Sequence, residues 1–263
     1  MSVQKDGQSS NDSRPALNGL RRLNLAAAIF FAAQVVVLLV LAAPVSLPVT
    51  GSFLTNAPGA GQYGTTELFS LRIDLIVAVF LGLAALDHFA VGTFVRRQYE
   101  KLIRNWQNPF RWSEYAISAS LMIVLISMLT GVSDVVALLG IFGANAAMIL
   151  FGLAMERANA GQDRVDWAPF IYGCIIGAIP WIAIVIQFAL AESNADGVPG
   201  FVYGIFISLF LLFNCFAVNM WLTYRRRGKW QDPLFAERVY VFLSITAKTA
   251  LAWQVYSGAL AGS

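Results

Sequence analysis

A single lysine, Lys248, lies in the middle of the apolar stretch LSITAKTALAW, at residues 243–253. A charge at bilayer depth costs about 3 kcal/mol on insertion scales, so this amine should face the protein interior and have a partner. Glu114, in the stretch WSEYAISASLMIV, is an acid that could supply the opposite charge. Ser118 lies one helical turn after Glu114 and Ser244 one turn before Lys248, so each serine shares a helix face with its charged neighbour. We therefore expect a buried cluster of these four residues.

Three kinds of site could use such a lysine. It could form a structural ion pair with Glu114, although buried pairs often fail to recover the free energy lost on leaving water. It could belong to a transporter or a proton relay. It could also form a Schiff base, because a desolvated amine is a competent nucleophile toward an aldehyde. The aromatic residues that could line a flat polyene pocket, or serve only in packing, are Tyr115, Trp181, Phe206, Phe210, Phe213 and Trp253.

Two further ionisable residues, Asp87 and His88, are neighbours in the apolar stretch FLGLAALDHFAVG. Adjacent residues point about 100° apart around a helix, so both cannot face inward well. His88 could be a hydrogen-bonded structural residue or a proton acceptor. Asp87 could instead reach the cytoplasmic interface.

The composition indicates an integral membrane protein. Of 263 residues, 58% are hydrophobic and 13% are charged, and the mean hydropathy is +0.65. A soluble domain normally carries about 25% charged residues, so too little polar surface remains here to coat a globule. Cys174 and Cys215 both lie in apolar runs, which gives no sign of a disulfide framework.

Seven segments reach the length of about 20 apolar residues that a helix needs to cross the hydrocarbon layer. They predict an all-α, seven-helix membrane bundle with helices near 23–43, 71–94, 109–129, 135–155, 167–190, 201–222 and 239–260. Asn108 followed by Pro109 predicts a capped start of the third helix. Pro180 falls inside the fifth helix, where we expect a kink.

The basic residues predict the orientation of the bundle. With seven crossings, sixteen of them share one side: Lys5, Arg14, Arg21, Arg22, Arg96, Arg97, Lys101, Arg104, Arg111, Arg157, Arg164, Arg225, Arg226, Arg227, Lys229 and Arg238. The other side holds Glu67, Asp134, Glu192 and Asp196, with Arg72 near a helix end. Because basic loops stay in the cytoplasm, the N-terminus should be cytoplasmic and the C-terminus extracellular.

The parts outside the helices are a tail and one long loop. Residues 1–22 are polar and predict a flexible cytoplasmic tail rather than a signal peptide, before a single membrane domain at 23–263. The outer loop at about 44–70 contains TGSFLTNAPGAGQYGTTE, rich in Gly, Thr and Pro. This composition is compatible with a hairpin that caps the outer face, and equally with an irregular loop.

Three stretches resemble the heliorhodopsins, a family of retinal-binding proteins distant from the proton-pumping microbial rhodopsins. They are NPFRWSEYAISASLMIVLISMLTGVSDVVALLGIFGANAAMILFG, VPGFVYGIFISLFLLFN and AKTALAWQVYSG, and the resemblance runs from about residue 23 onward. Heliorhodopsins are inverted relative to ordinary rhodopsins, which agrees with the orientation derived from the loop charges. The resemblance thus implies an inverted, rhodopsin-like bundle in the cell membrane.

The resemblance also implies roles for particular residues. Lys248 would carry all-trans retinal as a protonated Schiff base with Glu114 as counterion, and Ser118 and Ser244 would hydrogen-bond this pair. His88 matches a family histidine near a polar cavity on the cytoplasmic side. The candidates for the retinal pocket are Tyr115, Met122, Asn145, Trp181, Phe206, Phe210 and Trp253. Phe31 stands where family members often have a second histidine, so a two-histidine proton acceptor cannot form here.

The function that the resemblance implies is light sensing without net ion pumping. Outward of Lys248 the candidate interior groups are neutral, namely Gln34, Gln187, Asn214, Gln254 and Tyr256, while Asp74 lies near the rim. A pump would need a chain of proton sites to both faces, so these neutral groups argue against pumping. The alternative is a light-gated or light-driven ion (proton) transporter. An enzyme is not expected, because we find no metal site, phosphate-binding loop or nucleophilic triad.

The expected partners are membrane lipid and, by the resemblance, a second copy of the chain in a homodimer. The basic loops could dock an acidic cytoplasmic signalling partner, or they could reflect topology alone. No nucleic acid partner is expected.

Overall fold

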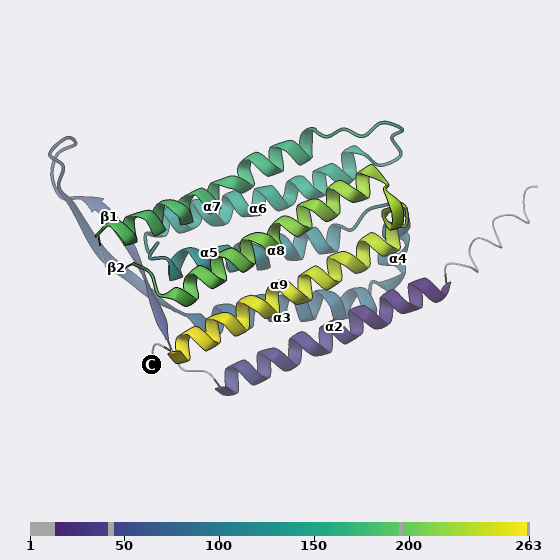
Figure 1. The fold of residues 1–263 in the computed structure, drawn as a ribbon, viewed down its shortest axis with the longest axis horizontal. Helices are drawn as coiled ribbons and strands as arrows, with labels where there is room; N and C mark the ends of the chain where they lie inside the picture. Colours follow the sequence, from purple (N-terminus) through teal and green to yellow (C-terminus); the bar gives the residue numbers. More distant parts are fainter. Residues whose placement is uncertain (1–13, 42–44, 195–196, 262–263) are drawn as a thin grey trace, which may run out of the picture.

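The structure, a computed structural model, describes residues 14–41, 45–194 and 197–261. Within these ranges the chain forms long helices joined by short segments and one two-stranded sheet. The elements are α2 (Arg14–Leu41), β1 (Ser46–Leu54), β2 (Tyr63–Arg72), α3 (Ile73–Gly92), α4 (Arg96–Arg104), α5 (Pro109–Leu129), α6 (Val135–Ala158), α7 (Ala168–Asn194), α8 (Gly200–Arg225), the short 3-10 helix η1 (Gly228–Gln231) and α9 (Pro233–Ala261). The long helices run side by side, and the two strands project from one end (Figure 1).

Six helices in the described part of the chain, α2, α3 and α5 to α8, are long and apolar enough to cross a membrane. α9 has 29 residues and packs against α8 and α2, but Glu237, Arg238 and Lys248 reduce its apolar character. Its length and its place in the bundle make it the seventh long helix. The prediction of an all-α bundle is therefore confirmed, and the chain is a multi-pass membrane protein.

The helix ends follow local chemistry. α5 begins at Pro109 as predicted, and the side chain of Asn108 caps it by accepting a hydrogen bond from the backbone N–H of Arg111 at 3.1 Å. α2 begins at Arg14 rather than near residue 23, so residues 14–22 belong to the helix and not to a tail. The reason is burial, since Leu17 and Leu20 pack in an apolar cluster with residues of α4. The rest of the predicted tail lies outside the described residues.

α5 is the most enclosed of the six apolar helices. In the most apolar stretch of α5, 67% of the residues are buried, whereas the corresponding share in α8 is 17%. α5 therefore lies inside the bundle and α8 at its edge. Large apolar side chains such as Val40, Leu86 and Leu139 point outward and are exposed. In a membrane these surfaces contact lipid, which is as apolar as they are.

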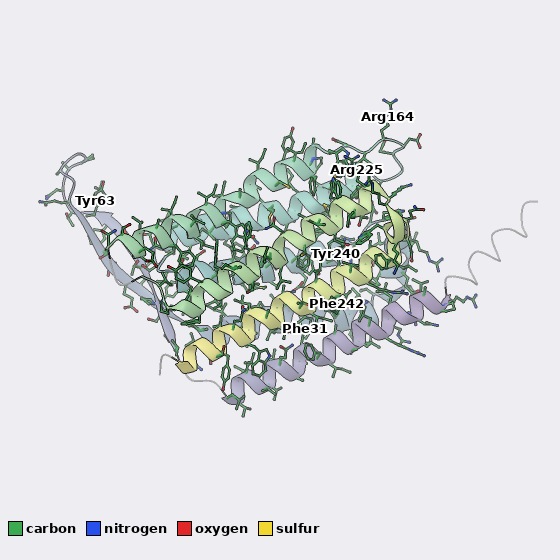
Figure 2. All side chains as sticks on the ribbon, viewed as in Figure 1. Phe31, Tyr63, Arg164, Arg225, Tyr240 and Phe242 are labelled. Carbon is green, nitrogen blue, oxygen red and sulfur yellow. The ribbon has the colours of Figure 1, made fainter. Side chains whose placement is uncertain are left out.

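The basic residues gather at one end of the bundle, which we call the basic end. It comprises α4, the turn between α6 and α7 with Arg164, and residues 225–229 at the end of α8 and just after it. In Figure 2, Arg164 and Arg225 lie at this end, whereas Tyr63 of the hairpin lies at the other. The basic segments that were predicted to share one side of the bundle thus lie at the same end.

The long loop between α2 and α3 contains a hairpin, one of the two alternatives that its composition allowed. β1 and β2 pair antiparallel, with Val49 opposite Phe69 and an irregularity in register after Val49. The backbone N–H of Thr50 donates to the carbonyl of Ser133 at 2.8 Å, and the N–H of Ser52 donates to the Asp134 carboxylate at 3.1 Å. The hairpin is thereby attached to the turn between α5 and α6.

Asp134 also caps α6, because its carboxylate accepts the N–H groups of Val136 and Ala137 at 2.9 and 3.2 Å. The hydrogen bonds from Ser52 and from these helix amides lower the pKa of the Asp134 carboxyl. A carboxyl whose pKa is lower in the folded state stabilises the fold above its unfolded pKa, and this contribution is lost as the pH falls through the folded value.

We expect Asp134→Ala to increase hydrogen exchange at the backbone amide of Ser52 at neutral pH. The difference between the variant and the native protein should shrink in acid, because protonation of the native Asp134 carboxylate removes its stabilising charge as well. Exchange followed by mass spectrometry, expressed as protection relative to the intrinsic rate, measures this effect. Asp134→Asn keeps a capping oxygen and serves as the control, with a smaller change that does not depend on pH. Equal protection in all three proteins would show that Asp134 does not hold the hairpin.

Candidate functional site

Lys248 and Glu114 face each other between α9 and α5. The Nζ atom of Lys248 donates to both carboxylate oxygens of Glu114, at 2.8 and 2.9 Å, and lies 3.3 Å from the hydroxyl of Ser244. Only 4% of the lysine side chain and 6% of the glutamate side chain are exposed. The structure therefore pairs the two buried charges and adds one of the two serines.

Ser118, the other serine of the expected cluster, is fully buried. Its hydroxyl has no hydrogen-bond partner in the described part of the chain. It lies one turn from Glu114 on α5, on the same face of the helix. A buried hydroxyl without a partner costs free energy, so this position has the capacity to bind one more polar atom.

Two aromatic rings lie close to the lysine nitrogen. The Nζ atom is 4.9 Å from the ring centre of Tyr115 and 5.9 Å from that of Phe31. The Tyr115 hydroxyl donates to the backbone carbonyl of Tyr240 at 3.2 Å, which fixes the ring against α9. A cation over such ring faces is attracted by their negative quadrupole.

A group of aromatic residues joins α7 to α8. The ring of Trp181 lies 5.7 Å from Phe206, 5.2 Å from Phe210 and 5.6 Å from Phe213, in edge-to-face contacts. Trp181 is nearly buried, but Phe210 is 40% exposed and so also faces the outside of the bundle. These contacts make a continuous aromatic wall between the two helices.

The remaining pocket candidates lie in different places. Met122 and Asn145 are buried, and the amide of Asn145 donates to the Ser120 hydroxyl at 3.1 Å. Trp253 is 37% exposed and lies against α2, where its indole N–H donates to Gln34 at 3.1 Å. Trp253 is therefore not part of the aromatic wall around Trp181.

His88 is buried, whereas its neighbour Asp87 is only partly buried. The Nδ1 atom of His88 lies 2.7 Å from the amide oxygen of Asn24 on α2. Phe31 stacks on the imidazole, with ring centres 5.7 Å apart and planes inclined by 13°. Phe31 is also close to Lys248, so its apolar ring contacts both the lysine and the histidine. A polar side chain at this position could have linked Lys248 to His88 by hydrogen bonds.

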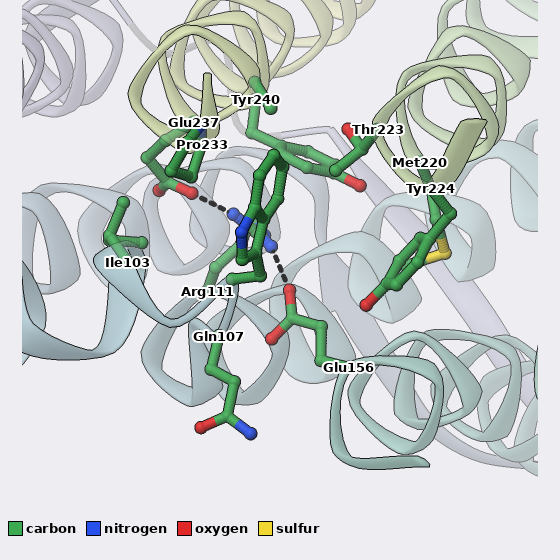
Figure 3. A pocket seen from close by; sticks show the side chains of 12 residues that line it. Ile103, Gln107, Arg111, Glu156, Met220, Thr223, Tyr224, Pro233, Glu237 and Tyr240 are labelled. Carbon is green, nitrogen blue, oxygen red and sulfur yellow. Dashed lines mark hydrogen bonds and ion pairs between the residues drawn. The ribbon is translucent and has the colours of Figure 1, made fainter. Parts of the chain in front are cut away.

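A second buried ion cluster lies at the basic end, and sequence reasoning missed it. Arg111 of α5 donates to Glu156 of α6 at 2.5 Å and, through its other terminal nitrogen, to Glu237 of α9. Figure 3 shows its guanidinium between the two carboxylates, beside the ring of Tyr240 at 3.8 Å. Asn108 adds its amide to Glu237 at 2.8 Å and its backbone N–H to Glu156 at 2.6 Å. The cluster thus locks α5, α6 and α9 together beside a cavity.

The position of Arg111 corrects one sequence expectation. Its place in the sequence predicts a cytoplasmic loop cation, but it lies in the first turn of α5 with 7% of its side chain exposed. The signal in the sequence was an arginine directly after a capped helix start, with Glu156 and Glu237 near the ends of other predicted spans. Which of these acids meets the arginine depends on tertiary packing.

The metal-binding residues give no further site, since no group of three or more His, Cys, Asp or Glu within the described ranges could hold a metal ion. The described side chains offer the chemistry of a buried amine held against a carboxylate. Aromatic contacts surround it, and the His88–Asn24 pair and the Arg111 cluster lie nearer the basic end. An amine in this position can condense with an aldehyde, and the carboxylate can stabilise a positive charge on the product nitrogen.

Comparison with known proteins identifies relatives of the fold and of the sequence. The bundle is similar to the crystal structure of the light-driven proton pump rhodopsin of Coccomyxa subellipsoidea, with a TM-score of 0.64 and 17% sequence identity over 90% of this chain and 95% of that one. At this identity the likeness concerns the fold. No curated protein matches the chain. The family model described as heliorhodopsin matches residues 20–260, which is most of the sequence. The chain belongs to the heliorhodopsin family.

Proposed function

We propose that this protein is a light sensor in which Lys248 carries all-trans retinal, with Glu114 as the counterion and without net ion pumping. Membership of the family implies a retinal chromophore. The observation that carries the proposal is the buried contact between the Lys248 amine and the Glu114 carboxylate at 2.8 and 2.9 Å. Attachment joins the amine nitrogen to the aldehyde carbon as a C=N bond and releases water.

The residues present fit this chromophore. The amine is buried, which shields a C=N linkage at this position from hydrolysis by water. Ser118 offers a buried hydroxyl without a partner in the described chain, next to Glu114. The aromatic wall of Trp181, Phe206 and Phe213 supplies the flat apolar surfaces that suit a polyene.

The two charges couple light to conformation in the proposed sensor. Retinal, when bound, supplies visible absorption and a double bond that isomerises. Glu114 stabilises the proton on the Lys248 nitrogen, and their separation tunes the absorbed wavelength. When the nitrogen moves relative to Glu114, the energy of the pair changes, and α5 and α9 that carry them favour a different arrangement.

The outer half of the bundle supports sensing rather than pumping. Asp74, the carboxylate expected nearest the rim, is engaged by Arg72 at 2.5 Å. The other polar groups on this side, such as Gln34 and Gln254, are neutral amides that hydrogen-bond Trp253 and Ser208. Neutral amides do not store a proton, so these groups provide no stepwise route outward.

A light-driven or light-gated proton transporter is the second candidate. The observation in its favour is the buried pair of carboxylates, Glu156 and Glu237, at the basic end. Intramembrane carboxylates are common members of proton routes. Both are held by Arg111 here, which also explains them as a structural cluster.

The proposal includes the setting of the protein. We place the N-terminus and the basic end in the cytoplasm, since the loop cations cluster there (Figure 2). The protein would reside in the cell membrane as a homodimer, would not act as an enzyme, and would signal to an unidentified cytoplasmic partner through this basic face.

The decisive experiment is expression with all-trans retinal, followed by absorption spectroscopy and by pH recording of an illuminated cell suspension. A visible band without a light-induced pH change is the result that supports the sensor. A sustained pH shift that an uncoupler abolishes would overturn the sensor in favour of transport. Absence of any visible band would overturn both.

We expect Glu114→Gln to weaken the hold on the proton at the Lys248 nitrogen. An opposite charge at this distance is worth about 1–3 pH units, so the visible band should bleach at a pH lower by that amount than in the native pigment. Titration of the absorption band in detergent measures the midpoint. Glu114→Asp keeps the charge and should shift the midpoint less. An unchanged midpoint in Glu114→Gln would show that another group is the counterion.

A further inference from the structure

His88 is the first member of a buried hydrogen-bond chain that runs toward the basic end. Its Nδ1 atom lies 2.7 Å from the side-chain oxygen of Asn24. The amide nitrogen of Asn24 donates to the backbone carbonyl of Leu20 at 3.1 Å and to the Tyr99 hydroxyl at 3.3 Å. The Tyr99 hydroxyl in turn donates to Glu237 at 3.1 Å.

The two ends of this chain fix the direction of every hydrogen bond in it. The Leu20 carbonyl can only accept, so the Asn24 atom beside it must be the NH₂ group, and the amide oxygen is the atom that faces His88. At the other end, the Glu237 carboxylate accepts from Tyr99. Burial and the nearby Glu237 charge raise the pKa of the Tyr99 hydroxyl, so it keeps its hydrogen and donates it.

An amide oxygen has no hydrogen to give, which decides the state of the imidazole. The nitrogen of His88 that faces Asn24 must carry a hydrogen, and in the neutral ring the other nitrogen is then bare. We infer that Asn24 is a positioning residue that holds His88 as the Nδ1–H tautomer, so that His88 gains and loses its exchangeable proton at Nε2 alone. Phe31, stacked on the ring, holds its plane in the orientation that this bond needs.

The same link isolates His88 from the basic end. The Asn24 oxygen is too weak a base to accept a proton from the imidazole, so a proton bound at Nε2 does not pass through Asn24 to Tyr99 and Glu237. The charged or titratable groups around the chain are Lys248 beyond Phe31, Asp87 next to His88, and Arg111, which pairs with Glu237. The tautomer of His88 follows from the hydrogen bonds alone, and only its role during a light response rests on the proposed function.

The chain offers a direct test because it contains one histidine. We would incorporate isotope-labelled histidine and record the imidazole by solid-state NMR in lipid, in the dark, with and without all-trans retinal. Correlation of each ring nitrogen with Cγ or Cδ2 tells Nδ1 from Nε2. The expected result is a hydrogen-bearing Nδ1 and a bare Nε2. A native protein with the hydrogen on Nε2 would overturn the inference without any variant.

Variants then test the role of Asn24. Asn24→Leu should shift the imidazole to the Nε2–H form that histidine prefers in water, or to a mixture. Asn24→Asp restores an acceptor toward Nδ1 and should keep the hydrogen there, which is a rescue that packing alone would not produce. Asn145→Leu is the matched control, since Asn145 is equally buried but bonds Ser120, and it should leave the tautomer unchanged. An unchanged tautomer in Asn24→Leu, or the same shift in Asn145→Leu, would refute the role of Asn24.

The outcome is separable from that of the proposed function, because colour is read on the same samples. Pigment with the wrong tautomer refutes the inference and leaves the sensor standing. The predicted tautomer in a protein that never forms pigment refutes the sensor and leaves the inference standing.

Discussion

Lys248→Ala is expected to abolish the visible absorption band entirely in protein expressed with all-trans retinal. The amine at this position is buried against Glu114, and alanine has no nitrogen to form the C=N bond. The measurement is the absorption spectrum of purified protein, normalised to the protein concentration. Hydroxylamine with light should bleach the native band, and it should find nothing to bleach in the variant.

Two variants make this result specific. Lys248→Arg keeps a positive charge beside Glu114, and hence the ion pair, but its guanidinium does not attach the chromophore, so it should fold and remain colourless. Lys229→Ala removes an exposed lysine after α8 and should keep full colour. A visible band in Lys248→Arg would mean that the pigment is attached elsewhere or is not covalently bound.

Arg111→Leu is expected to destabilise the fold strongly. It removes the guanidinium that pairs with Glu156 and Glu237, and leaves two buried carboxylates without this opposite charge. Breaking a buried pair by removing one partner costs about 3–5 kcal/mol. The thermal unfolding midpoint in detergent, followed by circular dichroism, should therefore fall strongly, and the yield of folded protein should fall with it.

The triple variant Arg111→Leu, Glu156→Gln, Glu237→Gln distinguishes lost charge balance from lost packing. It removes the uncompensated charges and should recover much of the stability, because neutral amides are cheaper to bury than carboxylates. Arg225→Leu is the control for a cation at the same end, where Arg225 is exposed over Trp167, and its effect should be about 1 kcal/mol or less. Native-like unfolding of Arg111→Leu would show that the cluster contributes no stability.

Much of the bundle could be predicted because the membrane imposes simple rules on sequence. The start of α5 at Pro109 follows from Asn108, a strong capping residue directly before a proline. The contact of Lys248 with Glu114 could be expected because few charged residues lie within the spans, and an isolated charge there needs a partner. Both features thus follow from local sequence or from the small number of charged residues within the spans.

The polar clusters nearer the basic end could not be predicted in the same way. Arg111 and Glu237 are 126 positions apart, and the sequence near the helix ends offers many acids and bases as partners. Asn24 is a neutral residue with no pattern around it, and its amide donates to Tyr99 of α4, a helix in a segment between two predicted spans where the sequence indicates only a loop. The early start of α2 depends in the same way on packing against α4.

The attachment of α5 at both ends has a consequence for the spectrum. Beyond the last turn of α5, the hairpin contacts Ser133 and Asp134. In the first turn of α5, Arg111 is fixed by its ion pairs, and Glu114 lies one turn further along the helix. A helix pinned in this way samples few positions, so the electric field at the Lys248 nitrogen varies little from molecule to molecule. Inhomogeneous broadening should then be small, so most of the width of the pigment's band should be thermal, and the band should narrow clearly on cooling.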